Sequence, residues 1–178
     1  MRKTLLALCT LAVSAGAGAH SASDAYLNIV SDKSPSAAAA ASSAATVLHG
    51  QWDIALRDLE FVLKLNDRGD GELTWGEVRR HQAEIEKYAY AHLHIAGVSG
   101  GACSIEPTRQ MIDEHADGAY AALFFDVKCE RSPGGFALNY DLFFSIDPSH
   151  RGILVMRSGN EVATALLSPQ NAGITLNP

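Results

Sequence analysis

The sequence lacks a long apolar run, an excess of basic residues and the common catalytic motifs. Its leading apolar stretch, Leu5–Val13, is far shorter than the ~20 residues that a membrane-spanning helix needs, and no other run approaches that length. The formal net charge of −6 argues against nucleic acid or an anionic membrane surface as partner. No G-x-S-x-G, H-E-x-x-H or phosphate-cradling motif occurs. These absences favour a non-enzymatic domain that does not insert into a membrane, with an uncharacterised exported hydrolase as one alternative.

The N-terminus has the three parts of an export signal. Arg2 and Lys3 form a basic start, Leu5–Val13 is apolar, and Ala17–Ala19 offers a small-residue cleavage site. We therefore expect a signal peptide at residues 1–19, a mature chain that begins at His20, and a periplasmic or secreted location. Cleavage removes two of the 14 Lys and Arg and leaves 12 against 20 Asp and Glu, so the mature net charge becomes −8.

Few cysteines are present, and their number suits the compartment. Cys9 leaves with the signal, so Cys103 and Cys129 remain. An even pair in a small exported domain predicts a disulfide, and the close Cys spacing of zinc sites is absent. The two cysteines lie about equally far from Asp117-Gly118, a recognised hairpin turn, so strand pairing brings them opposite each other.

Alternating and periodic patterns predict an α+β fold. We expect a single β-rich domain over residues 20–178, an antiparallel β-sandwich-like fold with one inserted, EF-hand-like helix-loop-helix at 58–95. An Ala/Ser-rich loop is expected at 33–45, with a short frayed helix as the alternative. Strands are expected at 23–32, at 46–56, on both sides of "HADG" within 102–129, and in "FALNYDLFFSI", "RGILVMRS" and "EVATALLS".

The insert is predicted from helical spacing on both sides of an acidic loop. Before the loop, "RDLEFVLKL" has apolar residues at helical intervals, and Asp58 is placed to cap the start. After it, one apolar stripe is expected on a continuous helix, formed by Trp75, Val78, Ile85, Tyr88 and His92 or Leu93.

The loop "LNDRGDGELTWGEV", residues 65–78, resembles a calcium-binding EF-hand loop of the pattern D-x-[DN]-x-[DN]-G-x5-E. Gly71 and Glu77 match positions 6 and 12, whereas position 3 holds Arg68, which supplies no oxygen and adds a positive charge. Weak calcium binding is therefore one expectation, and calcium is the cofactor it implies. The ligands would be Asn66, Asp70, Glu72 through its carbonyl, Thr74 and Glu77.

A metal-free structural role is the other expectation for this loop. Thr74-Trp75-Gly76-Glu77 has the T-x-x-E pattern of a capping box, in which Thr74 and Glu77 exchange hydrogen bonds at a helix start. Asp70-Gly71 is a good turn pair without any metal.

The runs "GQWDIALRDLEFVLKLNDRGDGELTWGEV", "DGAYAALFF" and "DLFFSIDPSHRG" resemble the N-terminal periplasmic region of HupE/UreJ-type bacterial membrane proteins. The loop of that family is similar to "LDANGDGRITWGEV", a more complete EF-hand, so this chain departs from it at Asn66 and Arg68. The resemblance implies a partner in the membrane, either a membrane protein or a membrane part missing from this chain, and an association with nickel or cobalt.

The histidines supply an alternative metal site. His20, at the mature N-terminus, would combine an α-amine with an imidazole, a good chelator of copper or nickel. His92 and His94 would face one way on a strand and diverge on a helix. The leading expectation is thus an exported binding or accessory domain. The alternative from another class is a periplasmic component that handles nickel, cobalt or copper for a HupE/UreJ-type membrane transporter.

Overall fold

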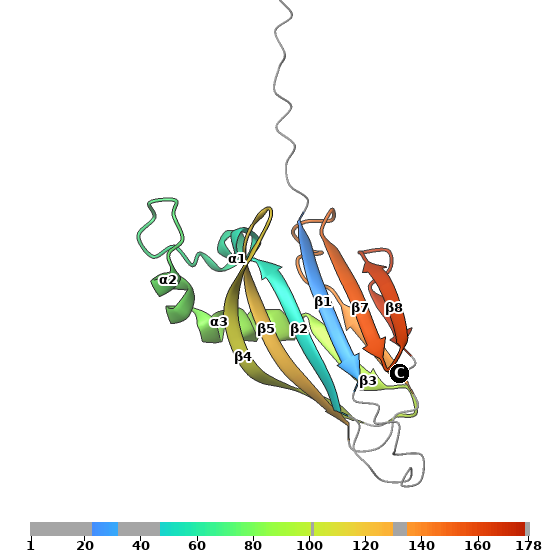
Figure 1. Ribbon diagram of the computed structural model, residues 1–178. Helices are drawn as coiled ribbons and strands as arrows, with labels where there is room; N and C mark the ends of the chain where they lie inside the picture. The colour runs from blue at the N-terminus through green and yellow to red at the C-terminus, as the bar shows by residue number, and fades with distance from the viewer. Residues whose placement is uncertain (1–22, 32–46, 101, 130–134, 177–178) are drawn as a thin grey trace, which may run out of the picture.

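The computed structural model describes residues 23–31, 47–100, 102–129 and 135–176 (Figure 1). The predicted signal peptide and the Ala/Ser-rich tract at 33–45 lie outside these residues. None of the described helices is long and apolar enough to cross a membrane. In chain order the elements are β1 (Asp24–Ser31), β2 (Val47–Ala55), α1 (Leu56–Leu63), α2 (Trp75–Arg80), α3 (Gln82–Ala91), β3 (Leu93–Gly97), β4 (Cys103–His115), β5 (Gly118–Cys129), β6 (Phe136–Tyr140), β7 (Arg151–Ser158), β8 (Glu161–Leu167) and β9 (Gly173–Leu176).

Six strands form the larger sheet, in the order β4-β5-β2-β1-β7-β8 (Figure 1). Neighbouring strands run antiparallel except β1 and β7, which are parallel. A smaller antiparallel sheet has the order β3-β6-β9. The fold is therefore mixed, with few helices and mostly antiparallel sheets, as the coarse sequence pattern predicts.

One face of the larger sheet is buried. On β1 and β2, alternate residues point to this face, so that Leu27, Ile29, Trp52 and Ile54 are all fully buried. Tyr90 of α3 lies against the rings of Trp52 and Phe125, which places α3 on the buried face. A single hydrophobic core contains residues of both sheets and all three helices.

The β4–β5 hairpin confirms the turn and the disulfide expected from the sequence. β4 ends at His115 and β5 begins at Gly118, whose φ of 141° is one that other residues rarely adopt. Cys103 and Cys129 are paired across the two strands, and their sulfur atoms are bonded. The hairpin is thus closed by a turn at one end and by a covalent link at the other.

The helices differ from the sequence expectations in two ways. α1 begins at Leu56, directly after β2, and Asp58 lies in its first turn without capping it. The chain enters the helix early because Leu56 and Leu59 are both buried against the sheets. The continuous helix expected after the loop is divided at His81 into α2 and α3, and Trp75, expected in the buried stripe, is 57% exposed.

Two short strands were not predicted. Leu93–Ile95, expected in the helical segment, lie in β3, and β9 follows the last predicted strand. Both pair with β6, whose own strand ends at Tyr140 instead of continuing to Ile146. The residues after Tyr140 form turns, in which Phe143 has a left-handed φ of 60° and its ring is buried against Tyr88 and His150.

Candidate functional site

The EF-hand-like loop leaves α1 through a left-handed residue, Lys64, with φ 56°. Asn66, at position 1, turns its side-chain oxygen to the backbone N–H groups of Arg68 and Gly69 at 3.1 and 2.8 Å. Its amide nitrogen donates to Asp70 Oδ1 at 3.2 Å. This is the local bonding of an Asx turn, so the oxygen predicted as the first calcium ligand already accepts two hydrogen bonds from the loop itself.

The Arg68 guanidinium lies among three of the positions predicted to bind calcium. Its Nη2 is 3.1 Å from Asp70 Oδ2 and donates to the Glu72 carbonyl oxygen at 3.2 Å. Its Nε is 3.3 Å from Glu77 Oε1. Positions 5, 7 and 12 of the template thus surround a cationic side chain that belongs to position 3.

Glu77 is buried, with 1% of its side chain exposed. Its Oε2 accepts hydrogen bonds from the Thr74 hydroxyl at 2.6 Å and from the Thr74 N–H at 2.9 Å, and Thr74 Oγ1 accepts the Glu77 N–H at 3.4 Å. The expected capping box is therefore present. The bonds from Thr74, with a smaller effect of the Arg68 charge, lower the pKa of Glu77 to about 2. Its Oε1 accepts no hydrogen bond from the described residues, and Arg68 supplies the positive charge beside it.

Asp67, at position 2 of the template, points away from the loop centre and fixes the loop to the end of α2. Its Oδ2 accepts hydrogen bonds from Arg80 at 3.0 and 2.6 Å, and its Oδ1 lies 2.8 Å from His81 Nε2. Hydrogen bonds from His81 and Arg80 lower the pKa of Asp67, and those to Asp67 and Glu84 raise the pKa of His81. The sequence pattern had predicted no role for Arg80 or His81.

In this conformation the loop does not fit a calcium ion. The ion needs six to eight oxygens around one centre, whereas Asp70, Glu72 and Glu77 face a guanidinium and the Thr74 hydroxyl is bonded to Glu77. Among the residues that the structure describes, no group of three or more His, Cys, Asp or Glu side chains is arranged to hold a metal.

The three histidines of the alternative site are not gathered into one described cluster. His20 lies outside the described residues. His92 ends α3, and its Nδ1 is 2.8 Å from Asp141 Oδ1. His94 is exposed on β3, directly opposite Asn139 of β6.

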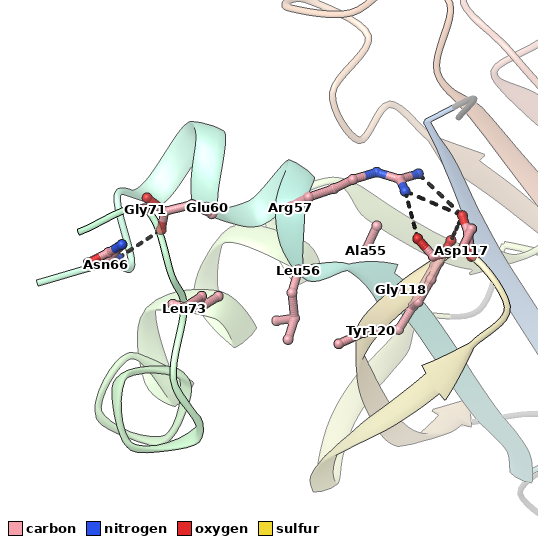
Figure 2. Close-up of a pocket in the computed structure, with 11 residues that line it drawn as sticks. Ala55, Leu56, Arg57, Glu60, Asn66, Gly71, Leu73, Asp117, Gly118 and Tyr120 are labelled. Carbon is pink, nitrogen blue, oxygen red and sulfur yellow. Dashed lines mark hydrogen bonds and ion pairs between the residues drawn. The ribbon is translucent and has the colours of Figure 1, made fainter. Parts of the chain in front are cut away.

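A pocket of about 410 Å³ lies between the EF-hand-like loop, the start of α1 and the β4–β5 hairpin. Figure 2 shows Asn66, Gly71 and Leu73 on the loop side and Asp117, Gly118 and Tyr120 on the hairpin side. The loop is therefore one wall of the pocket, and the ion pairs and hydrogen bonds of Arg68 and Asp67 stabilise the conformation of that wall.

The polar groups of the pocket are bonded to one another. Arg57 is 3.4 Å from Asp117 Oδ2, which also accepts the Tyr120 hydroxyl at 3.0 Å. The hydrogen bond from Tyr120, ahead of the contribution from Arg57, lowers the pKa of Asp117. On the opposite wall, Glu60 Oε2 accepts the Asn66 N–H at 2.8 Å. The pocket is thus lined by a cation, Arg57, and an anion, Glu60, on neighbouring turns of α1, with Leu56 and Leu73 between the walls.

A second cluster of hydrogen-bonded polar side chains, which the sequence pattern did not predict, lies near the start of β7. His150 is fully buried, with its Nδ1 2.7 Å from Ser23 Oγ and its Nε2 2.6 Å from the Tyr140 hydroxyl. The Ser23 hydroxyl donates its own proton to Asp58 Oδ2 at 2.9 Å. Its oxygen therefore accepts a hydrogen bond from the Nδ1–H of His150. The other ring nitrogen of His150, Nε2, then accepts the hydroxyl proton of Tyr140. Because the serine proton is directed to Asp58, His150 is not placed as a base for Ser23 here.

The predicted turn at "DPSH" is present beside this group, since Asp147 Oδ1 accepts the Ser149 N–H at 2.8 Å. His150 could not have been found from that motif, because its partners Ser23 and Tyr140 come from other parts of the chain.

No family model matches the chain, and no curated protein matches its sequence. Its function is therefore inferred from the geometry of the loop and of the pocket beside it.

Proposed function

We propose that the mature chain is an exported, non-enzymatic binding or accessory domain in which the EF-hand-like loop works without a metal. The observation that carries this proposal is the position of Arg68, whose guanidinium contacts Asp70, Glu72 and Glu77 together. A covalently attached cation balances the two carboxylates and needs no ion from solution. The loop then has a lasting structural task, which is to form one wall of the pocket in Figure 2.

The finer fold assignment belongs to the same proposal. We describe the domain as β-sandwich-like, with α1, the loop and α2 as an EF-hand-like insertion. The support is that the two sheets share one core and that the loop stands between two helices. The resemblance to the periplasmic region of HupE/UreJ-type proteins agrees with this description and suggests an accessory role beside a membrane protein.

Calorimetry on repaired loops tests the metal-free state. The unmodified protein should give no heat with millimolar calcium, whereas the variant that carries both Arg68→Asn and Asn66→Asp should give a heat of calcium binding in the same range. The repair removes the internal cation and restores oxygens at positions 1 and 3. Adding Glu77→Gln to the repaired loop should abolish binding, because the bidentate carboxylate is lost.

Arg79→Asn is a matched control. Arg79 is an exposed residue of α2, so its replacement removes one positive charge and leaves the Arg68 contacts in place, and the calcium response should be unchanged. Calcium binding by the unmodified chain would overturn the metal-free loop. Titration with nickel and copper in the same buffer tests the metal-handling alternative, which requires binding that histidine substitution removes.

A further inference from the structure

The two edges of the six-stranded sheet are built differently. Natural edge strands are protected from pairing with other chains by charged residues, proline and bulges. β4 has all three, since it carries Pro107, a register shift between Pro107 and Arg109, and the charged residues Glu106, Asp113 and Glu114. The edge formed by β4 is therefore poorly suited to pairing.

β8, at the opposite edge, has few of these protections. Its sequence, EVATALL, contains no proline and no basic residue, and its only charge is at its first position, Glu161. It pairs with β7 in one register from Ser158–Glu161 to Gly152–Leu167, and no described strand pairs with its other side. At the end of this side, the Leu166 carbonyl oxygen accepts the Asn171 side-chain amide at 3.0 Å. Figure 1 shows β8 as the outermost strand of the sheet.

The outward face beside this edge is apolar. Val162 and Leu166 are 61% and 56% exposed, and Thr164 lies between them on the same face. Their partners on β7 are Arg157, Val155 and Ile153, so the strip is apolar apart from the Thr164 hydroxyl at its middle and one charged side chain at its end. Exposed apolar residues grouped at an open edge are typical of an interface.

The β8 sequence is complementary to itself. In an antiparallel pair centred on Thr164, Val162 of one copy lies opposite Leu166 of the other, and Ala163 lies opposite Ala165. Glu161 then faces Leu167, and the two Glu161 residues stand at opposite ends of the strand pair, six positions or about 20 Å apart. The chain is acidic overall, yet this pairing sets no like charges against each other.

We infer that β8 is the interface of a symmetric dimer, in which a second copy of this chain continues the sheet by antiparallel β8–β8 pairing. The arrangement is isologous, with the same surface used by both copies. It covers the backbone groups of β8 that face away from β7, with the Asn171 amide displaced from the Leu166 carbonyl oxygen, and it places Val162 and Leu166 against each other across the two-fold axis. This inference does not depend on the metal-free loop or on the proposed accessory role.

Charge substitution at Thr164 tests the interface, because the two Thr164 side chains meet at the axis. Sedimentation of the oxidised chain should show a concentration-dependent dimer. Thr164→Lys and Thr164→Glu should each weaken dimerisation at least tenfold, since like charges directly opposite each other destabilise a strand pair. Thr164 is exposed in the single chain, so both variants should fold with their disulfide formed.

Mixing the two variants distinguishes self-pairing of β8 from a general effect of added charge. An equimolar mixture of Thr164→Lys and Thr164→Glu should recover the dimer, because opposite charges then meet at the axis. Met111→Lys is the matched control, since Met111 is a 46% exposed residue of the other edge strand, β4, and it should dimerise as the unmodified chain does. A chain that stays monomeric throughout the micromolar range, or a dimer unaffected by Thr164→Lys, would overturn the inference.

Discussion

Burial fixes the charge state of several single residues, and His150 is the clearest case. It is enclosed by Tyr140, Phe143 and Phe144, and its two ring nitrogens are bonded to Tyr140 and Ser23. Desolvation lowers the pKa of His150 to about 4 and outweighs the opposing effect of Asp147. The ring is therefore neutral at neutral pH, where one nitrogen donates and the other accepts.

This depressed pKa predicts a loss of stability in mild acid. The unfolded chain takes up a proton at His150 near pH 6.5, and the folded chain does so only near pH 4. The contribution of His150 to the free energy of unfolding is fully present above pH 6.5. It falls by about 3 kcal/mol as the pH drops from 6.5 to 4, and it does not change further below pH 4. Urea unfolding at several pH values measures it.

The variant His150→Gln isolates this effect. It should be less stable at pH 7, because the buried hydrogen bonds are altered, but its stability should fall less steeply between pH 6.5 and 4. His94→Gln changes an exposed histidine and should keep the slope of the unmodified chain. Equal slopes for His150→Gln and the unmodified chain would show that His150 is not buried as a neutral ring.

Sequence reasoning reached some residues of the candidate site and missed others for a physical reason. Thr74 and Glu77 are three positions apart, so their capping box follows from local spacing. Arg68 was recognised as a missing ligand, but the contacts of its long side chain with Asp70 and Glu77 depend on how the loop closes. Partners that lie further apart in the chain, such as Ser23 and His150, are set by strand pairing and leave no local signal.

Among the secondary-structure elements, the β4–β5 hairpin has the strongest independent constraint. The Cys103–Cys129 bond joins its open end and spans 26 positions of sequence. Such a link restricts the unfolded chain, so reduction should lower the free energy of unfolding by roughly 2–4 kcal/mol.

Urea titrations with and without reductant measure the difference. Before reduction, thiol labelling of the denatured mature chain should find no reactive cysteine. The double variant Cys103→Ser, Cys129→Ser is the control, since its stability should not respond to reductant. Two labelled thiols per mature chain, or identical titrations for oxidised and reduced protein, would contradict the prediction.

The elements that sequence reasoning placed are those with long alternating patterns and a marked turn. β4 and β5 flank Ala116-Asp117, and β7 and β8 flank Gly159-Asn160. β3 and β9 have five and four residues, too few for a period to stand out, and both owe their pairing to β6. The helix start at Leu56 was displaced from Asp58 because burial of Leu56 and Leu59 outweighs one favourable cap.

For the whole molecule, the position of Ser23 limits where the signal can be cut. Ser23 accepts the Arg151 N–H at 3.0 Å and bonds His150 and Asp58, so mature protein should retain it. We expect N-terminal sequencing of exported material to begin at or within a few residues of His20. Recovery of Met1 from correctly localised protein would contradict the signal assignment, and a start beyond Ser23 would contradict the role of this residue.

The parallel pairing of β1 with β7 has a consequence for the order of folding. β1 lies between β2 and β7 in the sheet. β2 follows β1 closely in the chain, whereas β7 begins only at Arg151. The two strands of the β4–β5 hairpin are adjacent in the chain, so they can pair as soon as both have been synthesised. The centre of the sheet can form only after nearly the entire chain has been synthesised, because β1 pairs with β7. Such long-range pairing slows folding. A chain that emerges with its N-terminus first therefore holds β1 with one side open until β7 arrives, and completing the sheet is a late step.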